Sequence, residues 1–145
     1  MKKLALLACL LVLTLVPQAN AQDWCSNADL RGVYSFVASG TFGSSPFAAA
    51  GQGTYDGKGG VTGLIQISVG GNVSSALTWS GTYTVDPENC TTTKTAVIPG
   101  APYGPGGEPE SLTVHFFITA GEDFKELRFI ATDPGTTISG TARKR

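Results

Sequence analysis

His115 and Glu126 are the two side chains of this sequence best suited to acid–base chemistry, and His115 is its only histidine. Segment 112–119 alternates apolar and polar residues, and His115 has the parity opposite to the apolar stripe. Glu126 likewise alternates with the apolar residues Leu127 and Phe129. Because an apolar stripe faces the interior of a β-protein, we expect both side chains on the outer face, as a cross-strand polar pair. An isomerase or cyclase that used them would need both inside a pocket.

The remaining polar residues form no recognisable catalytic or metal-binding motif. A single histidine cannot build a multi-histidine metal site, and no cysteine is expected to be free as a ligand. No G-x-S-x-G segment occurs, and the glycine-rich segment 56–60 lacks the helix and the hydroxyl residue of a phosphate-binding loop. The sequence therefore predicts no metal and no cofactor, and it favours a non-enzymatic protein.

Two of the three cysteines are expected to pair in the folded chain. Cys9 lies in the apolar leader, which leaves Cys25 and Cys90. An even pair in an exported domain predicts a disulfide, because oxidising compartments preserve such bonds. Closing a loop of this length stabilises the fold by about 4 kcal/mol in the chain-entropy description.

The first residues have the pattern of a secretory signal peptide. Lys2 and Lys3 precede an apolar run over 4–16, and Ala19-Asn20-Ala21 is a small-residue cleavage site. The run is shorter than the roughly 20 residues that a transmembrane helix needs. We expect cleavage after Ala21, and a secreted or periplasmic protein over residues 22–145. Lipoprotein processing at Cys9 is disfavoured, because the apolar run continues beyond it.

Charge argues against two classes of partner. The chain has 10 basic and 11 acidic residues. Removing the two leader lysines leaves 8 bases against 11 acids, a net charge of about −3. Nucleic acids and anionic membranes are bound by basic surfaces. We therefore expect neither as a partner, and the composition carries no signal of an oligomeric state.

The segments after the leader read as β-strands separated by turns rich in glycine, proline and aspartate. Residues of one parity are apolar and those of the other are Ser, Thr or charged, the period of a half-buried strand. The stretch 99–109 is rich in proline and glycine, and it is expected to be an exposed, irregular loop. The expected strands are 32–42, 47–55, 61–69, 73–85, 91–98, 112–119, 125–131 and 136–142.

Eight short strands with brief connections predict an all-β fold, a small antiparallel up-and-down barrel formed by a single domain. A two-sheet sandwich is the alternative, disfavoured because the short turns place consecutive strands side by side. The tripeptide Ser-Gly-Thr recurs at 39–41, 80–82 and 139–141. Glycine inside a strand indicates sharp curvature or a close backbone approach.

Aromatic residues dominate the parity that we assign to the interior. Small residues share that parity, among them Gly51, Gly53 and Gly63 on neighbouring segments and Ala49 beside them. Small residues beside large aromatic ones either make room for the neighbouring rings or leave space for a ligand. The sequence pattern leaves both interpretations open. The side chains expected to line a small-molecule site are Tyr34, Phe36, Trp79, Tyr83 and Phe116.

Three segments resemble a group of uncharacterised secreted bacterial proteins. They are LRGVY at 30–34, SGTYTVDPENCT at 80–91 and RFIATDPGT at 128–136. The group carries L-x-G-x-Y, SGTYTVNPDCTG and an F-x-x-TDPGT-x-x-SGTA ending. This chain departs from it at Glu88-Asn89, which adds a residue to the turn, and at Thr92, where the group has glycine. The resemblance implies a secreted β-domain and no particular activity.

A more distant similarity links the chain to lipocalin-like barrels. A Gly-x-aromatic segment ending at Tyr34 and a basic residue near the end, Arg143, are similar to the closing arrangement of those barrels, with tyrosine in place of their tryptophan. Allene oxide cyclase-like barrels share the expected architecture.

The leading hypothesis from the sequence is a secreted barrel, not an enzyme, that binds a small apolar ligand in its lumen or mouth. The alternatives are a barrel isomerase or cyclase that uses His115 or Glu126, and a surface or matrix protein that contacts other molecules through its polar faces and the 99–109 loop.

Overall fold

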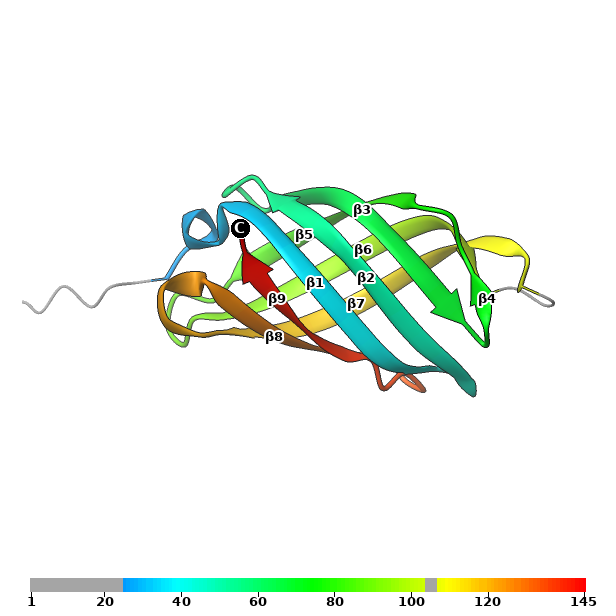
Figure 1. Ribbon diagram of the computed structural model, residues 1–145. Helices are drawn as coiled ribbons and strands as arrows, with labels where there is room; N and C mark the ends of the chain where they lie inside the picture. Colours follow the sequence, from blue (N-terminus) through cyan, green and yellow to red (C-terminus); the bar gives the residue numbers. More distant parts are fainter. Residues whose placement is uncertain (1–24, 104–106) are drawn as a thin grey trace, which may run out of the picture.

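Apolar and polar residues alternate along a set of antiparallel strands that curl into a closed barrel (Figure 1). The computed structural model describes residues 25–103 and 107–145, so the predicted signal peptide (1–21) and Cys9 lie outside it. The strands are β1 (Gly32–Phe42), β2 (Ser45–Tyr55), β3 (Gly60–Val69), β4 (Asn72–Val73), β5 (Leu77–Val85), β6 (Thr91–Pro102), β7 (Pro109–Ala120), β8 (Glu126–Ala131) and β9 (Ser139–Lys144).

Each long strand pairs with the strands before and after it in the chain, and β9 returns to pair with β1. The sheet order is β2-β1-β9-β8-β7-β6-β5-β3-β4, and the β2–β3 pairing closes it. Eight strands thus form an up-and-down antiparallel barrel, with the two-residue β4 as an extra strand on β3. The predicted barrel is confirmed, and the two-sheet sandwich is wrong.

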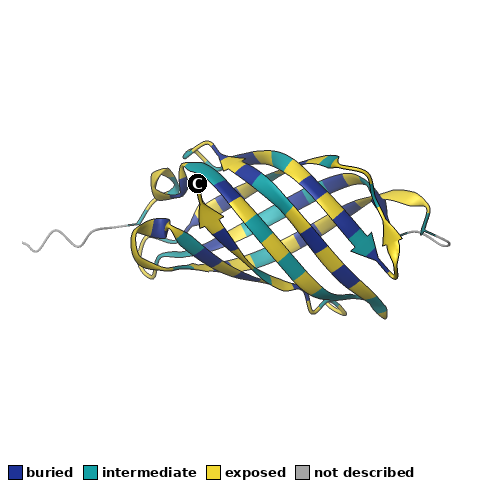
Figure 2. Cartoon of the chain, viewed as in Figure 1, coloured by how far each residue is buried: buried dark blue, intermediate teal, exposed yellow. Residues whose placement is uncertain are grey.

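Burial alternates along the long strands, as the bands of Figure 2 show, and it follows the predicted parity where the sequence assigned one, apart from Val73. In β5, for example, Trp79, Tyr83 and Val85 are buried while Thr78, Ser80, Thr82 and Thr84 are exposed. Inward side chains of the barrel form one hydrophobic core. The β-branched and aromatic content of these strands suits such a surface, because their side chains pack well on a pleated, half-buried sheet.

Two segments differ from their sequence prediction. The expected strand 73–85 is interrupted: Asn72 and Val73 form β4, Val73 is exposed, and β5 starts only at Leu77. The stretch expected to be an irregular loop after Ile98 is partly strand, because β6 continues to Pro102 and β7 begins at Pro109. A β-bulge between Ile98 and Ala101 absorbs the proline and glycine residues there, and this is how a strand accommodates them.

One end of the barrel is closed by two short 3₁₀ helices, η1 (Asn27–Leu30) and η3 (Glu122–Phe124), which lie at the same end as the C-terminus in Figure 1. The sequence did not predict either helix, because a single turn is too short to show a helical repeat of apolar residues. Leu30 is fully buried. The Tyr34 hydroxyl donates a hydrogen bond to the carbonyl of Phe124, 2.7 Å away. The Tyr83 hydroxyl donates to the carbonyl of Asn27 at 3.1 Å, which ties the tyrosines to both turns.

Glycines of the Ser-Gly-Thr tripeptides lie where neighbouring backbone approaches closely. A Cβ at Gly81 would collide with the carbonyl oxygen of Thr95, and one at Gly140 with that of Val37. Gly40 has a φ of +147°, a conformation that favours glycine. These glycines thus allow the close backbone approach that was one of the two predicted reasons for glycine inside a strand.

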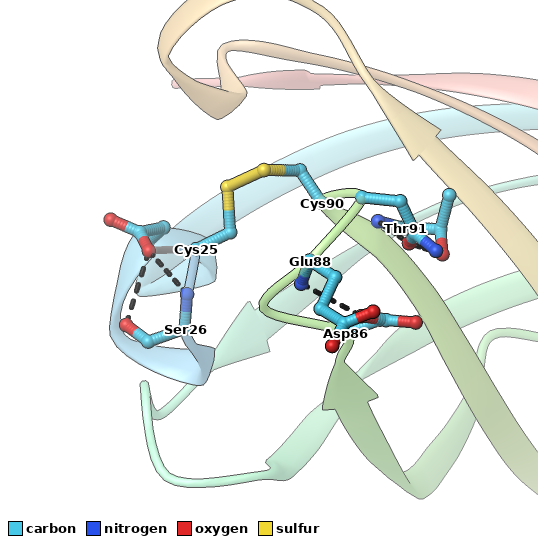
Figure 3. The surroundings of a disulfide bond; sticks show 8 residues. Cys25, Ser26, Asp86, Glu88, Cys90 and Thr91 are labelled. Atoms are coloured by element: carbon cyan, nitrogen blue, oxygen red, sulfur yellow. Dashed lines mark hydrogen bonds between the residues drawn. A yellow bond between two sulfur atoms is a disulfide. The ribbon is translucent and has the colours of Figure 1, made fainter. Parts of the chain in front are cut away.

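The predicted disulfide joins Cys25 to Cys90, with Cα atoms 5.3 Å apart. It ties the segment before η1 to the turn between β5 and β6 (Figure 3). Such a bond agrees with the expected export to an oxidising compartment. Among the described helices, none has the length and apolar character to cross a membrane.

Removing the disulfide should lower the free energy of unfolding by about 4 kcal/mol, because the bond restricts a long loop of the unfolded chain. The double variant Cys25→Ala/Cys90→Ala and the wild type in reductant should show the same loss in urea unfolding. Unchanged midpoints after reduction would show that the bond contributes nothing.

Candidate functional site in the barrel lumen

The barrel encloses an apolar cavity of about 40 Å³ at mid-length of its strands. One buried water needs roughly 10–15 Å³, and an apolar cavity that takes up benzene measures about 150 Å³. The free space therefore holds a small group in this conformation. Seven of the eight long strands, all but β9, supply its walls, together with Ile138 just before β9. The lining residues are Phe36, Ala38, Phe47, Ala49, Ile65, Trp79, Lys94, Ala96, Ile98, Val114, Phe116, Phe129 and Ile138.

Three of the five predicted ligand-lining aromatics border this cavity: Phe36, Trp79 and Phe116. The rings of Phe36 and Trp79 meet edge to face, with centroids 5.9 Å apart. Phe36 and Phe116 are half-buried, whereas Trp79 is almost fully buried. Phe36 and Phe116 are therefore the more exposed of these rings.

The other two predicted lining residues, Tyr34 and Tyr83, are not part of the cavity wall. They stack edge to face on Tyr55 at the closed end, with centroids 5.3 and 5.1 Å from its ring. Burial, with a smaller contribution from Tyr83, raises the pKa of Tyr34 to about 12. The error arises because parity places a side chain inside the barrel without giving its depth along the axis.

Glycines and alanines of the interior have different roles, which resolves the alternatives that the sequence left open. A Cβ at Gly53 would lie 2.8 Å from Cζ2 of Trp79, and one at Gly63 would lie 2.7 Å from its Nε1. The indole thus occupies the space over these glycines, and its Nε1–H donates to the Gln52 carbonyl at 3.2 Å. The alanines, in contrast, border the open space: Ala38, Ala49 and Ala96.

Lys94 is a site residue that sequence reasoning missed. It lies on β6 directly opposite Tyr83 of β5 and Phe116 of β7, on the inward face. Its Nζ lies 4.7 Å from the ring centroid of Phe116, 5.0 Å from that of Trp79 and 5.6 Å from that of Phe129. A cation among three ring faces is attracted by their quadrupoles. Lys94 is the one charged side chain in the cavity wall.

The charge of Lys94 has no counterion among the residues that the structure describes. Their ion pairs are His115–Asp133, Lys125–Asp123, Arg128–Glu126 and Arg143–Glu126. Desolvation lowers the pKa of Lys94 from its ordinary 10.5 to about 8. The amine is therefore mostly protonated at neutral pH and partly neutral in mild alkali.

The sequence does contain a signal for Lys94, in its parity. Thr92, Ala96 and Ile98 are buried, and Lys94 lies between them at the same period of two. The threonine-rich composition of 91–98 hides this stripe, because threonines occupy both faces. Assigning the face required the cross-strand partners.

His115 and Glu126 both lie on the outer surface of the barrel, as their parity predicted, so neither contributes to the lumen. They do not form the expected pair. His115 Nδ1 lies 2.7 Å from a carboxylate oxygen of Asp133, and the other oxygen accepts the backbone N–H of His115. Burial alone would raise the pKa of Asp133, but these hydrogen bonds outweigh it and lower the pKa. Glu126 instead lies within 4 Å of the guanidinium groups of Arg128 and Arg143.

Within residues 25–103 and 107–145, no group of three or more His, Cys, Asp or Glu side chains gathers in a way that would hold a metal ion. The chain matches no family model, no curated protein and no solved structure. The resemblance drawn from its motifs stays a prediction.

The pKa of Lys94 should be visible in the pH dependence of stability. Between pH 8 and about 10, the unfolded chain keeps a proton that the folded chain has released, so the free energy of unfolding should rise with pH. Well below pH 8, the Lys94 amine is protonated in both the folded and the unfolded chain, so its contribution to the free energy of unfolding does not change with pH. Urea unfolding of the wild type and of Lys94→Met at pH 7, 8.5 and 9.5 should show this rise in the wild type alone.

The comparison is confined to pH values below 10 because the tyrosines act in the opposite direction. Burial raises the pKa of Tyr34 and Tyr55, so the unfolded chain loses their protons first and stability falls in stronger alkali. Parallel stability curves for the wild type and Lys94→Met would contradict an inward, desolvated Lys94.

Proposed function

We propose that this protein is an exported, non-enzymatic β-barrel that binds a small apolar ligand in its lumen. The observation that carries the proposal is the apolar cavity bordered by Phe36, Trp79 and Phe116. Small-molecule sites are concave and mainly apolar, with a small number of placed polar groups, and here Lys94 is the charged one. The disulfide between Cys25 and Cys90 supports the secreted or periplasmic location.

The two ends of the barrel differ, which favours entry from one side. The tyrosine cluster, η1 and the disulfide obstruct one end. The opposite end carries the β1–β2 and β8–β9 turns and the paired ends of β6 and β7 at Pro102 and Pro109 (Figure 1). There the rings of Phe42 and Tyr103 meet edge to face, 5.4 Å between centroids. A ligand would enter past this pair and reach the cavity beyond it.

The volume of the cavity limits the ligand. At about 40 Å³, it holds only a few heavy atoms before side chains have to move. Phe36 and Phe116 are the half-buried rings in its wall, and rotation of either would enlarge it. Short-chain and single-ring compounds therefore require less movement of these side chains than long lipids.

Two other roles have less support. The isomerase or cyclase hypothesis used His115 and Glu126, and both side chains are outside the lumen. The surface-contact hypothesis has one observation in its favour: Phe117 and Ile130 are cross-strand neighbours on the outer face, exposed by 38% and 53%. The cavity has a defined lining and a defined chemistry, so the ligand-binding role is preferred.

Ligand binding should raise the melting temperature, because a ligand that binds only the folded state stabilises it by mass action. A panel of short fatty acids, alcohols, monoterpenoids and simple phenols should give a concentration-dependent shift for at least one class. Tryptophan fluorescence, measured in a Trp24→Phe variant so that Trp79 is its source, should be quenched or blue-shifted with the same dose dependence. A panel without any response in either measurement would overturn the proposal.

Filling the cavity should abolish that response. Ala49→Leu adds a branched side chain to the cavity wall, whereas the matched control Ala50→Leu adds it one residue along, on the exposed face of β2. Thermal shifts should vanish in Ala49→Leu and persist in Ala50→Leu. Equal shifts in both variants would place the binding site outside the lumen.

A further inference from the structure

Lys94 presents an uncompensated charge inside an otherwise apolar wall. The remaining side chains that border the cavity are aliphatic or aromatic, so none of them accepts a strong hydrogen bond from an ammonium group. From the neighbouring strands β5 and β7, the one titratable inward side chain is Tyr83, whose hydroxyl is engaged with Asn27 at the closed end. The three donors of Lys94 lack an acidic acceptor among the described residues.

This arrangement favours an anionic group as the missing partner. The aromatic rings of Trp79, Phe116 and Phe129 attract the cation, but they offer no oxygen to its N–H groups. Folding has already removed much of the water from the ammonium group. Lys94 is half-buried, so a carboxylate that arrived there would form charge-assisted hydrogen bonds at a smaller desolvation cost than at an exposed lysine.

We propose that Lys94 recognises the carboxylate of a small apolar carboxylic acid, and this inference rests on the proposed ligand-binding function. The carboxylate would lie in the cavity against Nζ, and the apolar part of the ligand would lie along the alanine side of the wall, Ala38, Ala49 and Ala96. A neutral ligand of the same shape would leave the ammonium unpaired. The barrel would therefore select acids over the corresponding alcohols.

The test compares ligands that differ only in their polar group, hexanoate with 1-hexanol and benzoate with benzyl alcohol. Affinities are measured by calorimetry at pH 7 for the wild type and for Lys94→Met, which keeps the length of the side chain and removes its charge. The control is Lys144→Met: Lys144 is exposed, and its Nζ lies 5.7 Å from the Tyr34 ring outside the cavity.

In the wild type, each acid should bind about tenfold to a hundredfold more tightly than its alcohol. Lys94→Met should bind acid and alcohol equally, and Lys144→Met should keep the wild-type preference. Acids that bind no better than alcohols, or a preference that persists in Lys94→Met, would overturn the role of Lys94 and leave the proposed function standing. Wild-type protein that binds neither these ligands nor the wider panel would overturn both.

A measurement on the wild type alone covers the case in which Lys94→Met does not fold. Since the amine loses its proton around pH 8, hexanoate affinity should fall by up to about a hundredfold between pH 7 and pH 10. The affinity for 1-hexanol should stay constant over the same range. A pH-independent hexanoate affinity would contradict an ammonium–carboxylate contact.

Discussion

Closure of the sheet, through the pairing of β9 with β1, is the constraint on which the rest of this molecule depends. Without it, β1 and β9 would be open edges, free to pair with other chains. With it, eight strands enclose an interior whose width is set by strand number and tilt. Side chains from opposite walls then have to fit together within a lumen of fixed diameter. This explains why large residues lie next to small ones in the interior.

The interior is filled in two different ways along the barrel. At the closed end, Tyr34, Tyr55 and Tyr83 stack on one another, and hydrogen bonds hold two of their hydroxyls against η1 and η3. At mid-length, the Trp79 indole covers glycine backbone, while the alanine side of the wall leaves a cavity. The first arrangement packs the lumen with rings and hydrogen bonds. The second leaves space beside a desolvated cation, and the proposed ligand-binding function is based on this combination.

Alternation of apolar and polar residues predicted the face on which each candidate side chain lies, but not its neighbours. It placed His115 and Glu126 correctly on the outer face, and it placed all five selected aromatics on the inner one. It did not distinguish Phe36 at the cavity from Tyr34 at the closed end, because depth along the barrel depends on the stagger between strands. It also missed the carboxylate partner of His115, since Asp133 reaches it from a turn rather than from a strand.

The amino-acid sequence by itself determined most of the strands, the inward face of those that alternate clearly, and the antiparallel meander, because alternation, turn residues and short connections are local properties of the chain. The Cys25–Cys90 pairing followed from the count of cysteines. Only the tertiary structure decided what gathers at one depth of the lumen. Lys94 joins Trp79, Phe116 and Phe129 through the register and closure of four strands. No local sequence pattern predicts this contact, because the depth of each side chain depends on the stagger between strands, which all the strands of a closed barrel set together.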